Sequence, residues 1–136
     1  MNVLVVEPGV LPYEKEIDGL PDMKEIVGGP IEAIYPFSEN VAVVCNALAS
    51  DQSMEFNRSI PERSYGGVFG TFFVCGLGEE SFISLTPEQV RIYTERFKQA
   101  ETLVVMLGDQ PVVVESAAKL KHRPGRSRRP PKPQKR

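Results

Sequence analysis

Short hydrophobic blocks, separated by glycine, proline or clustered polar residues, run along most of this 136-residue chain. Residues 3–6 are continuously apolar and rich in valine, which predicts a strand. Residues 13–18 alternate acidic residues with a tyrosine, a lysine and an isoleucine, a pattern that suits a half-exposed strand. Two further apolar runs, residues 31–37 and 41–45, are joined by three polar residues, and this arrangement predicts a hairpin.

Two segments have helical spacing instead. In residues 20–27 the leucine, methionine and final valine share one face, and two glycines follow, so we expect a short helix there. Residues 87–99 repeat apolar side chains at the spacing of an amphipathic helix. The preceding Thr86 is a good N-cap, and Gln89 stands where a capping box needs it.

The second half of the chain contains the most apolar run, residues 68–75, which predicts a central strand with a bulge or close approach at Gly70. Residues 103–107 and 112–114 predict a second hairpin. Residues 46–66 show no clear period, so we expect a long irregular connection with room for one helical turn, the kind of segment that often binds ligands or moves.

Hairpin connections dominate this pattern, and they favour an α+β fold over a doubly wound parallel sheet. We expect a mostly antiparallel sheet of five to seven strands with one main amphipathic helix and one short helix. This domain should span residues 1–115, and residues 116–136 should form a disordered basic tail, because so few apolar side chains cannot offset the entropy of ordering.

The net charge of −2 conceals a strong asymmetry. Residues 1–115 hold seven Lys/Arg and all eighteen Asp/Glu residues, a formal charge of −11, whereas residues 116–136 hold nine Lys/Arg and no acid. The tail should therefore attract a polyanion. Its candidate partners are nucleic acid, bound weakly and without sequence preference, another acidic surface, or the acidic domain of the same chain. The expected polyanion-binding residues are Lys119, Lys121, Arg123, Arg126, Arg128 and Arg129.

Several segments of the chain resemble the DUF3846 family, a domain of unknown function. The resemblance lies within residues 1–107 and is carried by residues 27–37 (VGGPIEAIYPF), 57–58, 70–73, 76–77 and 85–88. Proteins that look like this family come from bacteria, phages and conjugative elements, so the resemblance implies an accessory protein of a mobile element. It implies no reaction and no catalytic residues.

The residue types in the domain exclude several kinds of active site. The one histidine, His122, lies in the tail, which removes Ser-His, Cys-His and His-metal sites from the folded part. Cys45 and Cys75 lie in apolar runs and suit buried, reduced thiols. The spacing of the carboxylates matches no metal loop, so we expect a solvated acidic face, with no metal and no cofactor.

The pair Asn57-Arg58 is the sharpest candidate site, because Arg58 is a scarce cation in an acidic domain. We expect the loop that carries this pair to lie beside Tyr35 and Thr71 and to bind a small anionic ligand. The alternative is structural: all four residues satisfy one another's hydrogen bonds and hold the loop in place.

These observations favour a non-enzymatic binding or regulatory module with a polyanion-binding tail, whose partner is an unknown protein or a small anion. The alternative is a small enzyme that acts on an anionic substrate through carboxylates and Arg58. The absence of a long apolar run predicts no membrane span, and the start of the sequence does not read as a signal peptide, so we expect a cytoplasmic protein.

Overall fold

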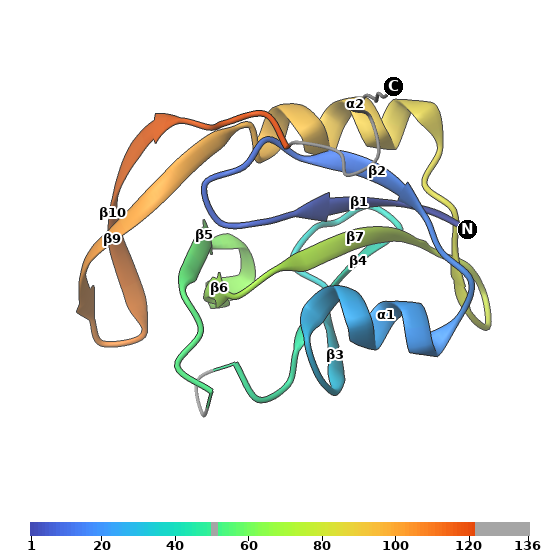
Figure 1. The fold of residues 1–136 in the computed structure, drawn as a ribbon, viewed down its shortest axis with the longest axis horizontal. Helices are drawn as coiled ribbons and strands as arrows, with labels where there is room; N and C mark the ends of the chain where they lie inside the picture. The colour runs from blue at the N-terminus through green and yellow to red at the C-terminus, as the bar shows by residue number, and fades with distance from the viewer. Residues whose placement is uncertain (50–51, 122–136) are drawn as a thin grey trace, which may run out of the picture.

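A six-stranded antiparallel sheet forms the centre of the computed structural model, which describes residues 1–49 and 52–121 (Figure 1). Five strands follow the order β2-β1-β7-β4-β3, and β8 pairs with β7. Their bounds are β1 Asn2–Val6, β2 Tyr13–Glu16, β3 Ile31–Ile34, β4 Val41–Asn46, β7 Phe72–Leu77 and β8 Phe82–Ile83. The α+β class and the predominantly antiparallel pairing predicted from the sequence are confirmed.

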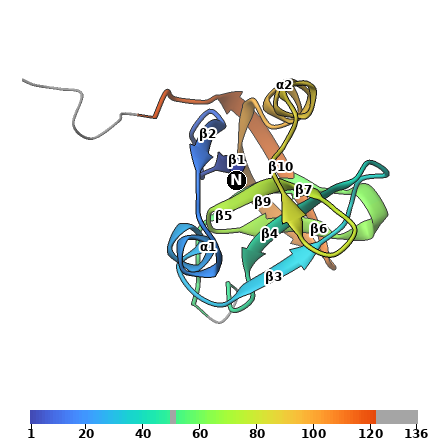
Figure 2. The ribbon, with the colours of Figure 1, turned by 90° about the vertical axis from the view of Figure 1, so that its right-hand side faces the viewer.

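Helices cover both faces of this sheet because its central strands are apolar on both sides. The strands β1, β4 and β7 are buried along almost their whole length. Helix α1 (Leu20–Val27) packs Met23 and Val27 on one face. Helix α2 (Pro87–Arg96) covers the other face with Tyr93 and the following Phe97, and Figure 2 shows the two helices on opposite sides.

The capping residues predicted from the sequence begin and end the two helices. The Thr86 hydroxyl accepts a hydrogen bond from the Gln89 backbone N–H, and the Gln89 side chain accepts one from the Thr86 N–H, so the capping box is complete. Helix α1 ends at Gly28, whose φ of 83° lies in the left-handed region. Helix α2 stops at Arg96, three residues before the predicted end at residue 99.

The middle of the chain differs from the prediction. Residues 46–66 contain strand β5 (Phe56–Ile60) and a 3-10 turn (Glu62–Ser64) in addition to irregular backbone. The predicted strand 68–75 is divided at Gly70, whose φ of 80° ends β6 (Gly66–Phe69) before β7 begins. The predicted single strand is therefore wrong: β6 pairs with β5 in a separate hairpin, and β7 lies in the main sheet.

The second predicted hairpin is confirmed and is longer than expected. It consists of β9 (Gln99–Leu107) and β10 (Gln110–Ala117), and it projects from one end of the molecule (Figure 1). Beyond Ala117, the Lys119 backbone donates to the Gly9 carbonyl and accepts from the Leu11 N–H, so the fold continues past the expected boundary at residue 115. The remainder of the predicted tail, residues 122–136, lies outside the described residues.

Several apolar side chains on this hairpin remain exposed, with Leu107 at 66% the most exposed among them. The exposed aliphatic residues are Val104, Val105, Met106, Leu107, Val112 and Val114. No described helix is long and apolar enough to cross a membrane.

The docking of this hairpin on β6 can be tested at Gly66. Its φ is +87°, and a Cβ there would lie 2.5 Å from the backbone oxygen of Asp109 in the β9–β10 turn. Gly9 is the matched control, since its φ is +75° with nothing within 4 Å of such a Cβ. Gly9→Ala should cost about 1 kcal/mol of unfolding free energy from the left-handed backbone alone.

Gly66→Ala should cost clearly more than Gly9→Ala, because the hairpin must also move away from β6. Urea denaturation of both variants measures the difference. Equal losses of unfolding free energy in the two variants would show that the β9–β10 hairpin does not pack closely against Gly66.

Candidate functional site

Asn57 and Arg58 lie in strand β5, not in a loop, and both side chains are 0% exposed. The irregular connection predicted for this segment is therefore wrong at its two most prominent residues. An alternating pattern could not reveal the strand, because buried polar side chains occupy positions where an apolar residue would normally stand.

The guanidinium of Arg58 binds backbone from three parts of the chain. Its Nε and Nη2 donate to the Phe97 carbonyl oxygen at 3.2 and 3.0 Å, and Nη2 also donates to the Val10 carbonyl at 2.9 Å. Its Nη1 donates to Asn57 Oδ1 at 2.8 Å, and more weakly to the Asn57 and Glu7 carbonyls at 3.4 Å. Because Phe97 is the C-cap of α2, the guanidinium places a positive charge at the negative end of that helix.

Asn57 extends the same network. Its amide nitrogen donates to the Val6 carbonyl, at the end of β1, and to the Gly70 carbonyl, between β6 and β7, both at 2.9 Å. The pair therefore holds the end of β1, the β6–β7 junction and the end of α2 together. Buried carbonyl groups at chain turns need such donors, because water does not reach them.

Burial lowers the pKa of the Arg58 guanidinium from its ordinary value, since desolvation disfavours the charged form. The charge of Glu101 acts in the opposite direction, and the Arg96 charge adds to the lowering. Among the described residues no carboxylate forms an ion pair with Arg58, whose charge is balanced chiefly by carbonyl dipoles.

The four residues of the predicted ligand patch do not all meet. Thr71 follows Gly70, which accepts from Asn57, so these residues lie together. Tyr35 is 41% exposed, and its backbone N–H donates to the Tyr65 hydroxyl. It lines a pocket that includes none of the other three predicted residues. Every nitrogen of the Arg58 side chain is engaged, so an anion would have to displace protein carbonyls to bind there.

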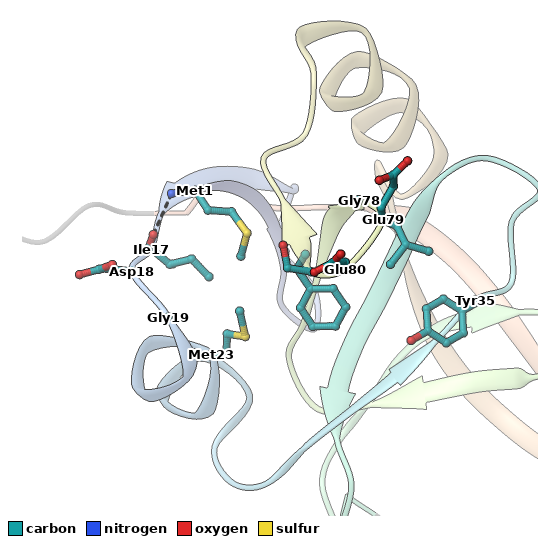
Figure 3. A pocket seen from close by; sticks show the side chains of 12 residues that line it. Met1, Ile17, Asp18, Gly19, Met23, Tyr35, Gly78, Glu79 and Glu80 are labelled. Atoms are coloured by element: carbon teal, nitrogen blue, oxygen red, sulfur yellow. Dashed lines mark hydrogen bonds between the residues drawn. The ribbon is translucent and has the colours of Figure 1, made fainter.

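The pocket at Tyr35 has a volume of about 700 Å³, and we call it the acid-rimmed pocket (Figure 3). It forms where the end of β2, the start of α1 and the β7–β8 turn approach one another. Its lining residues are Met1, Ile17, Asp18, Gly19, Met23, Tyr35, Leu77, Gly78, Glu79, Glu80, Ser81 and Phe82.

Apolar side chains form the interior of the acid-rimmed pocket. Met1, Ile17 and Met23 point toward its middle in Figure 3. Ile17 and Met23 belong to the core beneath α1, and Phe82 packs against that core. Methionine side chains adapt their shape readily, so the pocket has a deformable apolar floor.

Charged groups stand only at the rim. The carboxylates of Asp18, Glu79 and Glu80 are exposed. The amino group of Met1 donates to Glu16 at 2.7 Å and to the Ile17 carbonyl, so a carboxylate already balances this cation. Among the described residues that line the pocket there is no Lys or Arg, and the rim they form is therefore negative. This arrangement suits a ligand with an apolar body and a positive end.

The sequence contained only part of this site. Asp18 and the pair Glu79-Glu80 are visible as carboxylates, but they are distant in sequence and read as a solvated acidic face. Nothing in the sequence indicates that Met23 and Phe82 line a cavity, because both fit an ordinary core. The pocket exists only because the fold brings these distant segments of the chain together.

Neither cysteine offers a nucleophile. Burial raises the pKa of Cys45 to about 11 and that of Cys75 to about 12, so both thiols stay protonated near neutral pH. Both are free and buried, as the sequence predicts.

The structural role of Arg58 can be measured by substitution. Arg58→Ala should lower the free energy of unfolding by about 3–5 kcal/mol, because several buried carbonyls lose a charged donor. Arg58→Lys should recover little of this loss, since an ammonium cannot reproduce the planar fork of donors. Urea denaturation gives both values.

Arg91→Ala is the matched control, because this arginine is 69% exposed and pairs with Glu88, one helical turn away. The Arg91→Ala substitution should lower the free energy of unfolding by about 0.5 kcal/mol. Similar losses for Arg58→Ala and Arg91→Ala would contradict the structural role of Arg58.

The similarity of this chain to known proteins lies in the segment that forms the main sheet and the two helices. No curated protein and no solved structure matches this sequence. A family model matches residues 1–98, which include all of the main sheet, both helices and the β5–β6 hairpin but leave out β9 and β10. Since the match covers well over half of the chain, this protein belongs to the DUF3846 family, a domain of unknown function.

Proposed function

We propose that this protein is a non-enzymatic binding module whose acid-rimmed pocket takes a positively charged group on an apolar body. One observation carries the proposal: an apolar floor lies inside a rim of three exposed carboxylates, and the part of the chain that the structure describes adds no Lys or Arg to the lining. An apolar cavity with a few polar groups at its edge is the usual form of a ligand site.

The chemistry of the lining favours a cation over the small anion expected from the sequence. Glu79 and Glu80 adjoin each other in the β7–β8 turn, so an anion entering there would meet two like charges. An ammonium or guanidinium group would be attracted by the same charges. The exposed ring of Tyr35 adds a face on which a cation can rest.

The enzyme alternative depended on Arg58 and carboxylates acting together on an anionic substrate. The guanidinium is fully buried, and its donors are bound to protein carbonyls, so it does not face the acid-rimmed pocket. The binding role therefore has the stronger basis. The accessory role in a phage or another mobile element rests on the family resemblance, and we keep it as part of the proposal.

Binding of a cation can be tested with 2-phenylethylamine as the probe and its uncharged analogue 2-phenylethanol as the control ligand. In the full-length protein, the amine should shift the backbone NMR signals of Gly19 and Gly78 with a Kd of about 1 mM. The alcohol should bind about tenfold more weakly, because it lacks the charge that the rim attracts.

Glu79→Gln combined with Glu80→Gln should weaken amine binding about tenfold, and the matched control Glu25→Gln combined with Glu115→Gln should leave it unchanged. The control carboxylates are exposed and lie outside the lining. Equal binding of the amine and the alcohol would contradict the proposal.

We also propose that the basic tail binds a polyanion, since residues 116–136 hold nine Lys/Arg and no acid. Full-length protein should bind single-stranded DNA weakly at about 50 mM salt and lose most of that binding at about 200 mM, because counterion release drives it. A mobility-shift assay measures this. The variant Arg126→Gln, Arg128→Gln and Arg129→Gln should reduce the affinity and flatten the salt dependence.

Lys98→Gln is the control, because it removes a cation that lies outside the tail, just after the end of α2. It should leave DNA binding nearly unchanged. If the triple tail variant bound DNA as well as the wild type, the tail would not be the binding segment.

A further inference from the structure

We propose that the chain's own basic, proline-rich segment, residues 128–133 (Arg-Arg-Pro-Pro-Lys-Pro), occupies the acid-rimmed pocket and blocks it in the resting protein. This inference rests on the proposed function, because it names the occupant of the same pocket. Three observations carry it: where the described chain ends, what lies between that point and the pocket, and the chemistry of the segment.

The described chain ends beside the start of β2. The Lys119 backbone pairs with Gly9 and Leu11 on the β1–β2 connection. Lys121 Nζ lies 3.0 Å from the Glu7 carboxylate and 6.0 Å from the centre of the Tyr13 ring. The described chain therefore ends, at Lys121, next to Tyr13, the first residue of β2.

Strand β2 leads directly from that point to the pocket. It is an edge strand of the main sheet, and the residues that follow it, Ile17, Asp18 and Gly19, line the pocket. Glu14 and Glu16 are exposed along the way, although Asn2 and the Met1 amino group bind them on one side. A basic segment that follows β2 thus meets carboxylates at each step.

The segment is long enough for this path. From Tyr13 to Asp18, five residues of extended chain cover about 17 Å. The six residues from 122 to 127 span up to about 20 Å when extended, a length sufficient to bring Arg128 and the prolines after it to the pocket.

The chemistry of residues 128–133 fits the pocket. Three prolines restrict the backbone toward the polyproline II conformation, which loses little entropy on binding and places ring surfaces on apolar or aromatic side chains. Tyr35 and Phe82 provide aromatic surface, and Met1 and Met23 provide adaptable apolar surface. The arginines and the lysine complement the carboxylates of the rim.

Occupation in cis couples the two binding activities of the protein. While the segment fills the pocket, the pocket excludes other cations and the tail has fewer free cations for a polyanion. A polyanion that binds the tail opens the pocket, and by linkage a pocket ligand raises the affinity of the tail for the polyanion.

The test uses full-length protein with Pro130→Ala, Pro131→Ala and Pro133→Ala together, which leaves the net charge unchanged. If the segment occupies the pocket, the NMR signals of Gly19 and Gly78 should differ between the wild type and this variant. The variant should also bind 2-phenylethylamine about threefold more tightly, as expected if the segment fills about two-thirds of the pockets. Arg128→Gln with Arg129→Gln should act in the same direction.

Pro61→Ala is the matched control, because this proline lies in the domain outside the pocket, and it should leave amine affinity unchanged. Unchanged pocket signals and unchanged amine affinity in both tail variants would overturn the inference while the proposed function stands. Failure of the amine to bind wild type and tail variants alike would overturn the proposed function as well. Pocket signals that change with protein concentration would show that the tail of a second copy is the occupant, and would overturn docking in cis.

Discussion

The buried guanidinium of Arg58 binds backbone carbonyls from segments that are distant in the sequence. It supplies donors to carbonyls of the β1–β2 connection and of the α2 C-cap, while Asn57 reaches the end of β1 and the β6–β7 junction. Chain turns leave backbone carbonyls unpaired, and a planar group with five N–H donors can satisfy several of them at once. This one side chain joins the end of α2 and the β5–β6 hairpin to the β1–β2 connection, in addition to the apolar packing of Ile60 and Phe97.

Two of the seven Lys/Arg residues in residues 1–115 are engaged within the fold. Arg58 is withdrawn from solvent and Arg96 pairs with Glu62, so these cations do little to offset the exposed carboxylates. No Lys or Arg is among the described residues that line the acid-rimmed pocket, and Glu16 binds the Met1 amino group there. The excess positive charge is placed in the tail instead, and this separation gives a reason for tail and pocket to interact.

The two helices and most of the main sheet were predictable because their signals are local. The capping box at Thr86 and the apolar runs of β1 and β4 need no distant residue to be recognised. Strand β5 was missed because Asn57 and Arg58 are buried polar residues, whose partners lie 13 to 51 positions away in the sequence. Gly70 was recognised as irregular, but only the pairing of β6 with β5 turns it into a boundary between two sheets.

By itself the sequence determined the α+β class, the helices, the main hairpins, the family and the opposite charges of domain and tail. Tertiary structure alone decided that Arg58 is a buried connector, and that Tyr35 lines a separate pocket whose rim carries Asp18, Glu79 and Glu80. The physical reason is the sequence distance over which each property is determined. Periodicity, capping and net charge are properties of neighbouring residues, whereas the burial of a polar group and the shape of a cavity depend on which distant segments the sheet brings together.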